Sequence, residues 1–396
     1  MNLAFLADAR SPIAVNWIRW FVEHGHAVHW ISSRPAAPPL GGLASFQVLP
    51  IFPELPQGVK ISRKSRLLHP AATIVRHWWM PFRLEARARK LNQMLAEIQP
   101  DLLHAMRIPQ EGMVAAQAKG LGDSGGSFPL LVSVWGDDFT YHARSSPMMS
   151  ILTKSTMRKT DGLHSDCRRD IKLAFDWGLR IDTMTMVEPG NGGIRTDIFY
   201  QAKADSELIK KFALPKDAFF IVNPRGIRGV ARTDTFFQAI PEVCKAIPKA
   251  HFLALRMEGS AEAEEWIRRL GIRKHVTLLP VLSQEDISRL FRLSSIMVSL
   301  TVHDGIPNVL LESMACGCYP ICGKLDSLGD WISDGRNGSL VPPGEPGTVA
   351  GTIIRVASDP ELRKKAARRN RKIIADRAEW NGVMGRVEQF YRAMIT

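Results

Sequence analysis

The sequence lacks the patterns that turn cysteines into disulfides or metal ligands. Its cysteines are few, odd in number and without a CxxC pair, so neither a disulfide framework nor a four-ligand zinc site is indicated. We expect them to be reduced and mostly buried. They are Cys167, Cys244, Cys316, Cys318 and Cys322.

Long hydrophobic runs are also missing. No window approaches the roughly 20 apolar residues that span a bilayer. The apolar start at residues 2–8 is too short for a signal peptide and has no basic segment before it. We therefore expect a cytoplasmic protein whose contact with a membrane, if any, is peripheral.

A dinucleotide fingerprint is absent as well. Neither half of the chain has a GxGxxG pattern after its first apolar run, which disfavours nicotinamide and flavin enzymes. No HxxxH spacing suggests a metal centre. We expect no cofactor and no bound metal.

Acidic residues are outnumbered, and the excess of positive charge is the first positive feature. The net charge is +13 and the pI is about 9.7, which favours an anionic partner such as a nucleotide, an acidic lipid or a nucleic acid. Residues 60–90 hold nine Lys/Arg against one acid, with Trp78 and Trp79 between them. This mixture is typical of a segment that contacts anionic lipid, although a solvated segment with buried aromatics is an equal alternative.

The chain is long enough for two domains. Short runs rich in Val, Ile and Leu alternate with periodic segments, which predicts βαβ units and the α/β class. Two such series occur, at residues 1–190 and 191–377. We expect two doubly wound Rossmann-like domains that face a central cleft, with a C-terminal helix at 378–396 that packs back on the first.

The first domain offers a polar loop before its first helix. Ser11 is placed to cap that helix, Pro12 to occupy its first position and Gly25 to end it. Such a helix start can bind a phosphate, which makes Arg10 and Ser11 candidates for an acceptor or phosphate loop. An ordinary capped helix is the alternative.

The second domain concentrates charged residues after its strands. Arg225 and Arg228 follow the first apolar run, and a guanidinium suits an anion because its donors form a planar fork. A helix predicted to start near Pro307 would place Asn308 and Glu312 on one face. Leu310 and Met314 would then face the core.

The stretch "DGIPNVLLESMACGCYPI" resembles the E-x7-E region of the retaining glycosyltransferases of family four, which have the GT-B fold. Asp304 stands at the first acidic position and Glu312 at the second. The segment 329–346 is similar to the hairpin-like segment that follows the motif. "VSVWGDDF" is similar to the HGSD segment of the family, and "VEPGNGGIRTDIF" to its interdomain signature.

The resemblance implies a role for each matching residue. Glu312 would hold the ribose of a nucleotide sugar, and Asp304 would contact the transferred sugar. Arg225, with Arg228 as a second cation, would neutralise the leaving diphosphate without a metal ion. The backbone that supports the sugar and diphosphate would be that of Gly305, Ile306, Pro307, Asn308, Val309 and Leu310.

Three positions depart from the family pattern. Asp304 is one methylene shorter than the usual glutamate, and Val230 replaces the usual lysine, which leaves Arg228, Arg232 or neither as the second cation. Trp135 stands at the histidine of HGSD. Asp138 either faces the cleft or forms a strand-end turn.

The resemblance implies a hexosyltransferase that moves a sugar from a UDP- or GDP-sugar to a hydroxyl acceptor, with retention of configuration. A glycan or a lipid-linked acceptor in cell-surface polysaccharide or glycolipid synthesis is expected, at the inner face of the membrane, and no nucleic acid. Two alternatives are a nucleotide-sugar 2-epimerase of the same architecture and a non-catalytic protein that binds nucleic acid or membrane.

Overall fold

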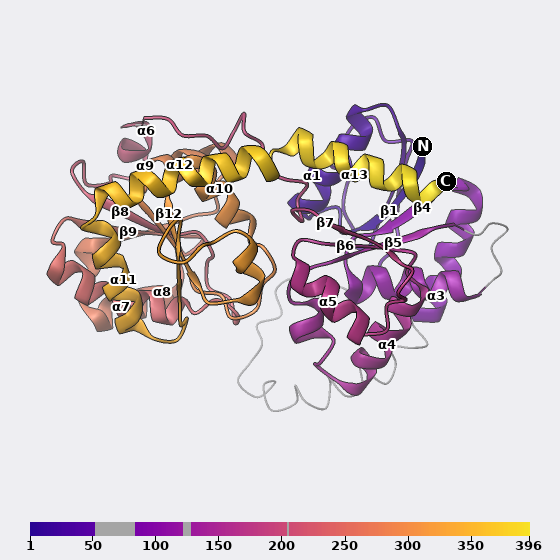
Figure 1. Ribbon diagram of the computed structural model, residues 1–396, viewed down its shortest axis with the longest axis horizontal. Helices are drawn as coiled ribbons and strands as arrows, with labels where there is room; N and C mark the ends of the chain where they lie inside the picture. Colours follow the sequence, from indigo (N-terminus) through magenta and orange to yellow (C-terminus); the bar gives the residue numbers. More distant parts are fainter. Residues whose placement is uncertain (52–83, 122–127, 204–205) are drawn as a thin grey trace. The chain divides into compact units, whose positions relative to one another are not determined.

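The computed structural model describes residues 1–51, 84–121, 128–203 and 206–396. The chain forms two compact units, shown in Figure 1. Unit 1 comprises Met1–Gly192 and Met384–Thr396, and unit 2 comprises Gly193–Val383. The greater part of the basic segment predicted to contact lipid, residues 60–83, lies outside the described residues.

Within the described residues, unit 1 is built on a parallel seven-stranded sheet with the order β3-β2-β1-β4-β5-β6-β7. Every neighbouring pair of strands is parallel. This doubly wound order confirms the predicted fold class for the first half of the chain. The strands are β1 Asn2–Ala7, β2 Ala27–Ser32, β3 Ser45–Val48, β4 Leu102–Ala105, β5 Leu130–Val134, β6 Gly162–Ser165 and β7 Met184–Val187.

Helix α1 begins and ends where its sequence predicts. It spans Pro12–Glu23, and the Ser11 side chain accepts a hydrogen bond from the Ala14 amide at its start. Gly25 follows the last turn with φ +75, a conformation that costs glycine little because it has no Cβ. The predicted cap, first residue and stop of this helix are confirmed.

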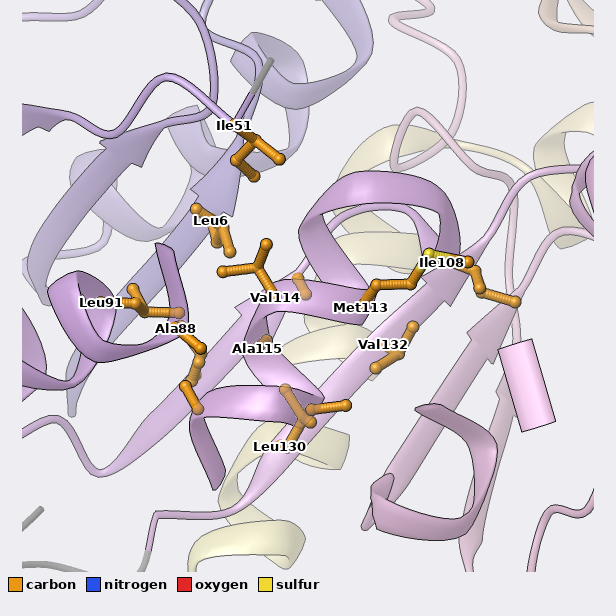
Figure 2. Packing of buried hydrophobic residues seen from close by; sticks show 14 of the residues in the cluster. Leu6, Ile51, Ala88, Leu91, Ile108, Met113, Val114, Ala115, Leu130 and Val132 are labelled. Carbon is orange, nitrogen blue, oxygen red and sulfur yellow. The ribbon is translucent and has the colours of Figure 1, made fainter. Parts of the chain in front are cut away.

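Helices cover both faces of the unit 1 sheet, α1 and α13 on one and α3, α4 and α5 on the other (Figure 1). On the latter face, alternate residues of β1, β4 and β5 pack against α3 and the helical residues 84–98 (Figure 2). Leu6, Leu91, Val114 and Val132 belong to this core and are fully buried. The other helices are α3 Met113–Leu121, α4 Pro147–Lys159, α5 Arg168–Asp176 and α13 Trp380–Ile395.

The opposite face carries a chain of buried hydrogen bonds that ties α1 and α13 to the sheet. The Trp17 indole donates to the Tyr391 hydroxyl at 3.0 Å, and that hydroxyl lies 2.5 Å from His104 Nδ1. His104 Nε2 lies 2.7 Å from Ser133 Oγ, which lies 2.8 Å from His164 Nδ1. The last group in the series, His164 Nε2, lies 2.9 Å from a main-chain carbonyl oxygen.

With both imidazoles neutral, the two ends of this series of hydrogen bonds fix the direction of every proton in it. An indole can only donate and a carbonyl can only accept. His164 must therefore donate through Nε2 and accept from Ser133, and His104 must accept from Tyr391 and donate to Ser133. Both imidazoles are neutral in this arrangement. Burial favours that state, because it lowers the pKa of His164 to about 4 and the pKa of His104 well below its usual value.

Replacing Tyr391 with phenylalanine should destabilise the protein by about 3 kcal/mol, since it leaves the Trp17 indole and His104 Nδ1 without partners in a buried site. The exposed Tyr141 provides a matched control, and Tyr141→Phe should change stability by less than about 0.5 kcal/mol. Urea unfolding of both variants measures the difference. Equal stabilities would show that the Tyr391 hydroxyl does not hold this network together.

Unit 2 contains a second parallel sheet, with six strands in the described residues and the order β10-β9-β8-β11-β12-β13. It completes the predicted pair of doubly wound Rossmann-like domains, which is confirmed. Its strands are β8 Phe219–Asn223, β9 Ala250–Leu255, β10 Val276–Leu279, β11 Ile296–Ser299, β12 Tyr319–Gly323 and β13 Ser339–Val341. Its helices are α6 Ser206–Lys211, α7 Thr233–Ala246, α8 Ala261–Leu270, α9 Gln284–Leu293, α10 Asn308–Cys316, α11 Pro346–Ala357 and α12 Pro360–Arg377.

The segment 329–346 differs from the hairpin-like form that its resemblance implied. Its second half is β13, which pairs with β12 in parallel, and a hairpin requires antiparallel strands. Before β13 the chain turns at Ser333–Gly338, where the Asn337 side chain accepts from the Ser333 amide at 2.7 Å and donates to Trp331 O at 2.9 Å. The side chain of this buried asparagine, and not the ladder of a hairpin, makes the hydrogen bonds to the main chain that stabilise the turn.

The cysteines are free, and all but Cys244 are buried. The Cys318 thiol lies 3.0 Å from Phe291 O, to which it donates. Cys316 and Cys322 belong to the buried hydrophobic residues of unit 2. The prediction that these side chains serve packing is confirmed.

Candidate functional site

Two loops at the carboxyl edge of the unit 2 sheet are held against each other. Because β8 and β11 are parallel neighbours, residues 224–232 and 300–307 leave the sheet at the same edge. The Val302 amide donates to Val230 O at 2.9 Å, which joins the two loops. The pairing brings together side chains that lie far apart in the sequence.

Arg225 and Asp304, two of the predicted catalytic residues, form an ion pair across these loops. Arg225 Nη2 lies 2.7 Å from Asp304 Oδ2, and the two side chains are 15% and 21% exposed. The main chain fixes both: the Arg225 amide donates to Asn223 Oδ1 at 3.0 Å, and Asp304 Oδ1 accepts from the Gly305 amide at 3.0 Å. Arg225 Nε is buried and has no acceptor among the described residues.

Helix α10 starts beside this ion pair. Pro307 stands before its first residue, and no side chain caps it. Of the three amides expected to be open there, that of Leu310 donates to Pro307 O at 2.9 Å, while Asn308 and Val309 keep part of their surface exposed. The partial positive charge of this helix end suits a diphosphate. The Leu310 side chain is fully buried, as predicted.

Glu312 lies one turn further along α10, on the same face as Asn308. The residue is partly exposed, while burial of its carboxyl raises its pKa to about 7, partly offset by the charge of Arg256. Among the described residues no hydrogen bond to this carboxyl is found. A raised pKa at the ligand edge of a sheet is typical of a functional carboxylate.

The sequence did not decide whether the second cation that would neutralise the diphosphate is Arg228, Arg232 or neither. Arg232 is engaged by Asp234, with Nε–Oδ1 and Nη2–Oδ2 distances of 2.9 and 2.8 Å. Arg228 lies in the same loop as Arg225 and pairs through its main chain with Ala231.

Arg256 is a cation that sequence reasoning missed. It follows β9 with a left-handed φ of 59, which is strained for a residue with a side chain. It also packs against Gly226 of the Arg225 loop, since its Cβ lies 3.3 Å from where a Cβ on that glycine would be. Its position immediately after a strand of the parallel sheet was the available signal.

Unit 1 contains a pocket of about 420 Å³ at the carboxyl ends of β1, β4 and β5. Ser11 and Trp135, two of the predicted acceptor-side residues, line it. Arg10 lies at its border and is paired with Asp8, with Nε–Oδ1 and Nη2–Oδ2 distances of 3.1 Å. The volume suits a small ligand.

Asp138 is buried beneath this pocket and does not face it. Its carboxylate accepts from Arg107 Nε at 3.0 Å and from the amides of Trp135 and Ile108 at 3.0 and 3.3 Å. Burial raises its pKa to about 6, although the charge of Arg107 lowers it. Asp138 therefore forms the strand-end turn that was the alternative. The expectation that it faces a cleft is wrong, because its carboxylate already accepts hydrogen bonds from main-chain amides.

Several residues that line the pocket were missed, among them Arg107 and Glu111. Arg107 Nη2 lies 2.9 Å from Asp137 Oδ1, and its guanidinium lies 5.1 Å from the Trp135 ring centroid. Arg107 and Glu111 follow β4 within a few residues. Ligands of doubly wound sheets bind beyond the carboxyl ends of the strands, and this rule could have identified both residues from the sequence.

Two family models match the chain. "Glycosyl transferase 4-like domain" matches residues 11–190, and "Glycosyl transferases group 1" matches residues 205–373. The chain belongs to the group 1 glycosyltransferases. It is therefore a transferase enzyme, and the two models together span both units.

This group 1 glycosyltransferase is similar to curated proteins over different lengths. It is 22% identical to N-acetyl-alpha-D-glucosaminyl L-malate synthase of Bacillus anthracis, across 93% of the chain and 90% of that protein. It is also 22% identical to D-inositol 3-phosphate glycosyltransferase of Streptomyces bingchenggensis, across 49% of the chain and 44% of that protein.

Solved structures show that the glycosyltransferase has the GT-B fold. Sucrose-phosphate synthase from Thermosynechococcus elongatus matches with a TM-score of 0.78 at 16% identity, covering 99% of this chain and 98% of that one. Anabaena Alr3699/HepE, solved in complex with UDP-glucose, matches with a TM-score of 0.76 at 15% identity, covering 99% of both chains.

A group of potential metal ligands in unit 1 is poorly suited to a cation. Asp166, Cys167 and Asp170 place ligand-type atoms within 4.8 Å of one another. Arg169 Nε already pairs with Asp170 Oδ1 at 2.9 Å. Burial raises the pKa of the Cys167 thiol far above its usual value, whereas the thiolate is the form that binds metals.

The helices in the described part of the chain include none that is both long and apolar enough to cross a bilayer.

Proposed function

We propose that this glycosyltransferase transfers a hexose-type sugar from a UDP- or GDP-sugar to a hydroxyl group, with retention of configuration and without a metal ion. The observation that carries the proposal is the Arg225–Asp304 ion pair, with an Nη2–Oδ2 distance of 2.7 Å, next to the uncapped start of α10. The diphosphate of a nucleotide sugar suits this combination of a guanidinium and a helix N-terminus. Its charge grows as the sugar leaves, and a fixed guanidinium stabilises that charge.

The remaining residues bind different parts of the nucleotide-sugar donor. The amides of Asn308 and Val309 at the start of α10 bind the diphosphate, with Gly305, Ile306 and Pro307 shaping the loop before it. Glu312 accepts hydrogen bonds from the ribose hydroxyls. Asp304 orients Arg225 and contacts the transferred sugar.

The names of similar proteins support a UDP-linked donor and a hydroxyl acceptor. Anabaena Alr3699/HepE was solved with UDP-glucose, and the relatives from Bacillus anthracis and Streptomyces bingchenggensis are named as a glucosaminyl malate synthase and an inositol phosphate glycosyltransferase. The resemblance to the retaining family supports retention. On the basis of the same resemblance, we assign the unit 1 pocket to the acceptor.

The excess of positive charge supports a place of action at an anionic surface. We propose that the enzyme works in the cytoplasm at the inner face of the membrane, where the net charge of +13 and residues 60–90 favour contact with acidic lipid. A lipid-linked or glycan acceptor of a cell-surface polysaccharide or glycolipid fits that location.

The purified chain should be stabilised by at least one member of a panel of UDP- and GDP-sugars, because a ligand that binds only the folded state raises the unfolding temperature. Label from that donor should then pass to a mixed panel of glycoside acceptors in the presence of EDTA. Proton NMR of the protein with UDP-N-acetylglucosamine alone separates the enzyme from a 2-epimerase. An epimer, or no stabilisation by any nucleotide sugar, contradicts the proposal.

A further inference from the structure

The described residues that line the unit 1 pocket have almost no unbalanced charge, despite the excess of positive charge in the chain. Among the described residues at or next to it, three arginines are engaged by three aspartates. Each arginine has an aspartate oxygen within 3.5 Å. The pairs are Arg10 and Arg34 with Asp8, and Arg107 with Asp137 and Asp138.

His142 does not add a free positive charge to the pocket. Its Nε2 lies 3.3 Å from Asp137 Oδ2. Burial opposes ionisation of Asp137, but the hydrogen bond from His142 and the charge of Arg107 hold its pKa below the usual value. Asp8 behaves in the same way, since Arg10 and Arg34 outweigh its burial and lower its pKa. Both aspartates are therefore ionised and occupied by cations.

Glu111 is the carboxylate of the pocket that these arginines do not pair with. It is 6% exposed, and its Oε1 accepts from Ser33 Oγ at 2.5 Å. Burial raises its pKa to about 7, although the Ser33 hydrogen bond and the charge of Arg107 lower it. A nearly buried carboxylate that accepts from a serine hydroxyl can still accept a hydrogen bond from a ligand.

The turn that presents Glu111 is strained in a way that fixes its position. Gln110 has φ 77 and ψ −80, which is unfavourable for a residue with a side chain. Gly112 on the other side packs so closely that a Cβ there would lie 2.8 Å from Arg107 O. Strain of this kind persists where the surrounding structure holds the backbone, and it is frequent at ligand sites.

We infer that this pocket binds an uncharged, hydroxyl-rich acceptor such as a neutral sugar ring, and that Glu111 accepts a hydrogen bond from one of its hydroxyl groups. The inference rests on the proposed function, which assigns the acceptor to unit 1. Ser11, Gln110 and Ser145 supply further polar groups, and Met106, Pro109 and Met149 supply apolar surface for the C–H face of a ring.

An anionic acceptor would be disfavoured by the same arrangement. A carboxylate or phosphate would compete with the aspartates for these arginines while it approached Glu111, and like charges repel at this range. The names of two similar proteins mention L-malate and inositol 3-phosphate, which are both anionic. The charge balance of this pocket therefore predicts a different acceptor class for this chain.

The test is a competition between acceptor classes. The intact chain is incubated with the labelled nucleotide sugar that stabilises it and with an equimolar mixture of neutral methyl glycosides, methyl uronides and sugar phosphates. Anion-exchange chromatography with a salt gradient then separates neutral products from charged products, and both from the unreacted nucleotide sugar, whose diphosphate is also negatively charged. We expect label in the neutral fraction at least about tenfold above the charged fractions.

Variants test the role of Glu111 in the same assay. Glu111→Gln should raise the acceptor KM about tenfold and leave the donor KM unchanged, because the hydroxyl group of the acceptor then bonds to a neutral amide instead of a carboxylate. Ser33→Ala, which frees the carboxylate from its partner, should raise the acceptor KM by a smaller factor. Glu97→Gln, an exposed residue in the helical segment 84–98, makes the same charge change and should alter neither constant. Thermal unfolding of each variant shows whether it is folded.

Each outcome decides one point. Label in the charged fraction, or in neither fraction while the donor is bound, overturns the neutral acceptor. An acceptor KM within twofold of wild type in folded Glu111→Gln overturns the role of Glu111. Failure to bind any nucleotide sugar instead removes the proposed function, and the inference falls with it.

Discussion

Replacing Arg225 with alanine is expected to lower kcat for sugar transfer about 1000-fold, which is the size of effect seen when a fixed group that stabilises developing charge is lost. The substitution removes the guanidinium whose Nη2 pairs with Asp304 and whose Nε is buried without an acceptor among the described residues. Arg225→Lys should recover only part of the rate, because an ammonium group lacks the planar fork. Steady-state transfer with the donor that the panel identifies measures both.

Arg268 provides the control for this experiment. It lies on α8, is largely exposed and pairs with Glu265 on the same helix. Arg268→Ala removes the same side chain from the same unit and should leave the transfer rate within about twofold of wild type, as is usual for exposed positions. A loss of less than tenfold in Arg225→Ala would mean that another group, such as Arg256, neutralises the leaving diphosphate.

Replacing Glu312 with glutamine should weaken nucleotide-sugar binding about 30-fold, since the ribose hydroxyls lose a charged acceptor. The same change should stabilise the empty protein at pH 8. The pKa of this carboxyl is about 7 in the folded protein, above its ordinary value of 4.5, so the fold resists its ionisation. The cost is absent below pH 4.5 and complete above pH 7, where it amounts to about 3 kcal/mol.

The pH dependence separates this cost from a general effect of the substitution. Glu312→Gln should unfold at higher urea than wild type at pH 8, and the difference should shrink towards pH 5. Glu242, exposed on α7, is the matched control, and Glu242→Gln should show neither the loss of binding nor the gain in stability. A variant that binds the donor normally, or whose stability relative to wild type is the same at both pH values, would contradict the role of Glu312.

The sequence predicted the sheets well where strands are rich in Val, Ile and Leu and fully buried. It missed β3, whose four residues are all only partly buried, and β13, which has three residues. Short strands at the edge of a sheet carry too little of the apolar pattern to be distinguished from loops. The capping signals of α1 were sufficient to predict its start and its end.

For the donor site, the sequence predicted which residues take part but not which of them contact each other. Arg225 and Asp304 were expected at the same edge, but nothing in the sequence shows that residues 79 apart form an ion pair. The acceptor side was predicted less completely. Glu111 and Arg107 follow a strand end and could have been found there, but the strained turn at Gln110 that presents Glu111 has no sequence signal, because glutamine does not favour a positive φ. Asp138 was misplaced for a related reason, since main-chain donors are invisible in a sequence.

Isothermal titration of the intact chain with UDP- and GDP-sugars, compared with Glu312→Gln and Glu242→Gln, tests the central claim most directly. Binding of one nucleotide sugar to wild type and to Glu242→Gln, weakened about 30-fold in Glu312→Gln, is the predicted result. Binding that is equally strong in all three proteins would contradict it, because the donor would then lie away from the edge formed by α10 and the Arg225 loop.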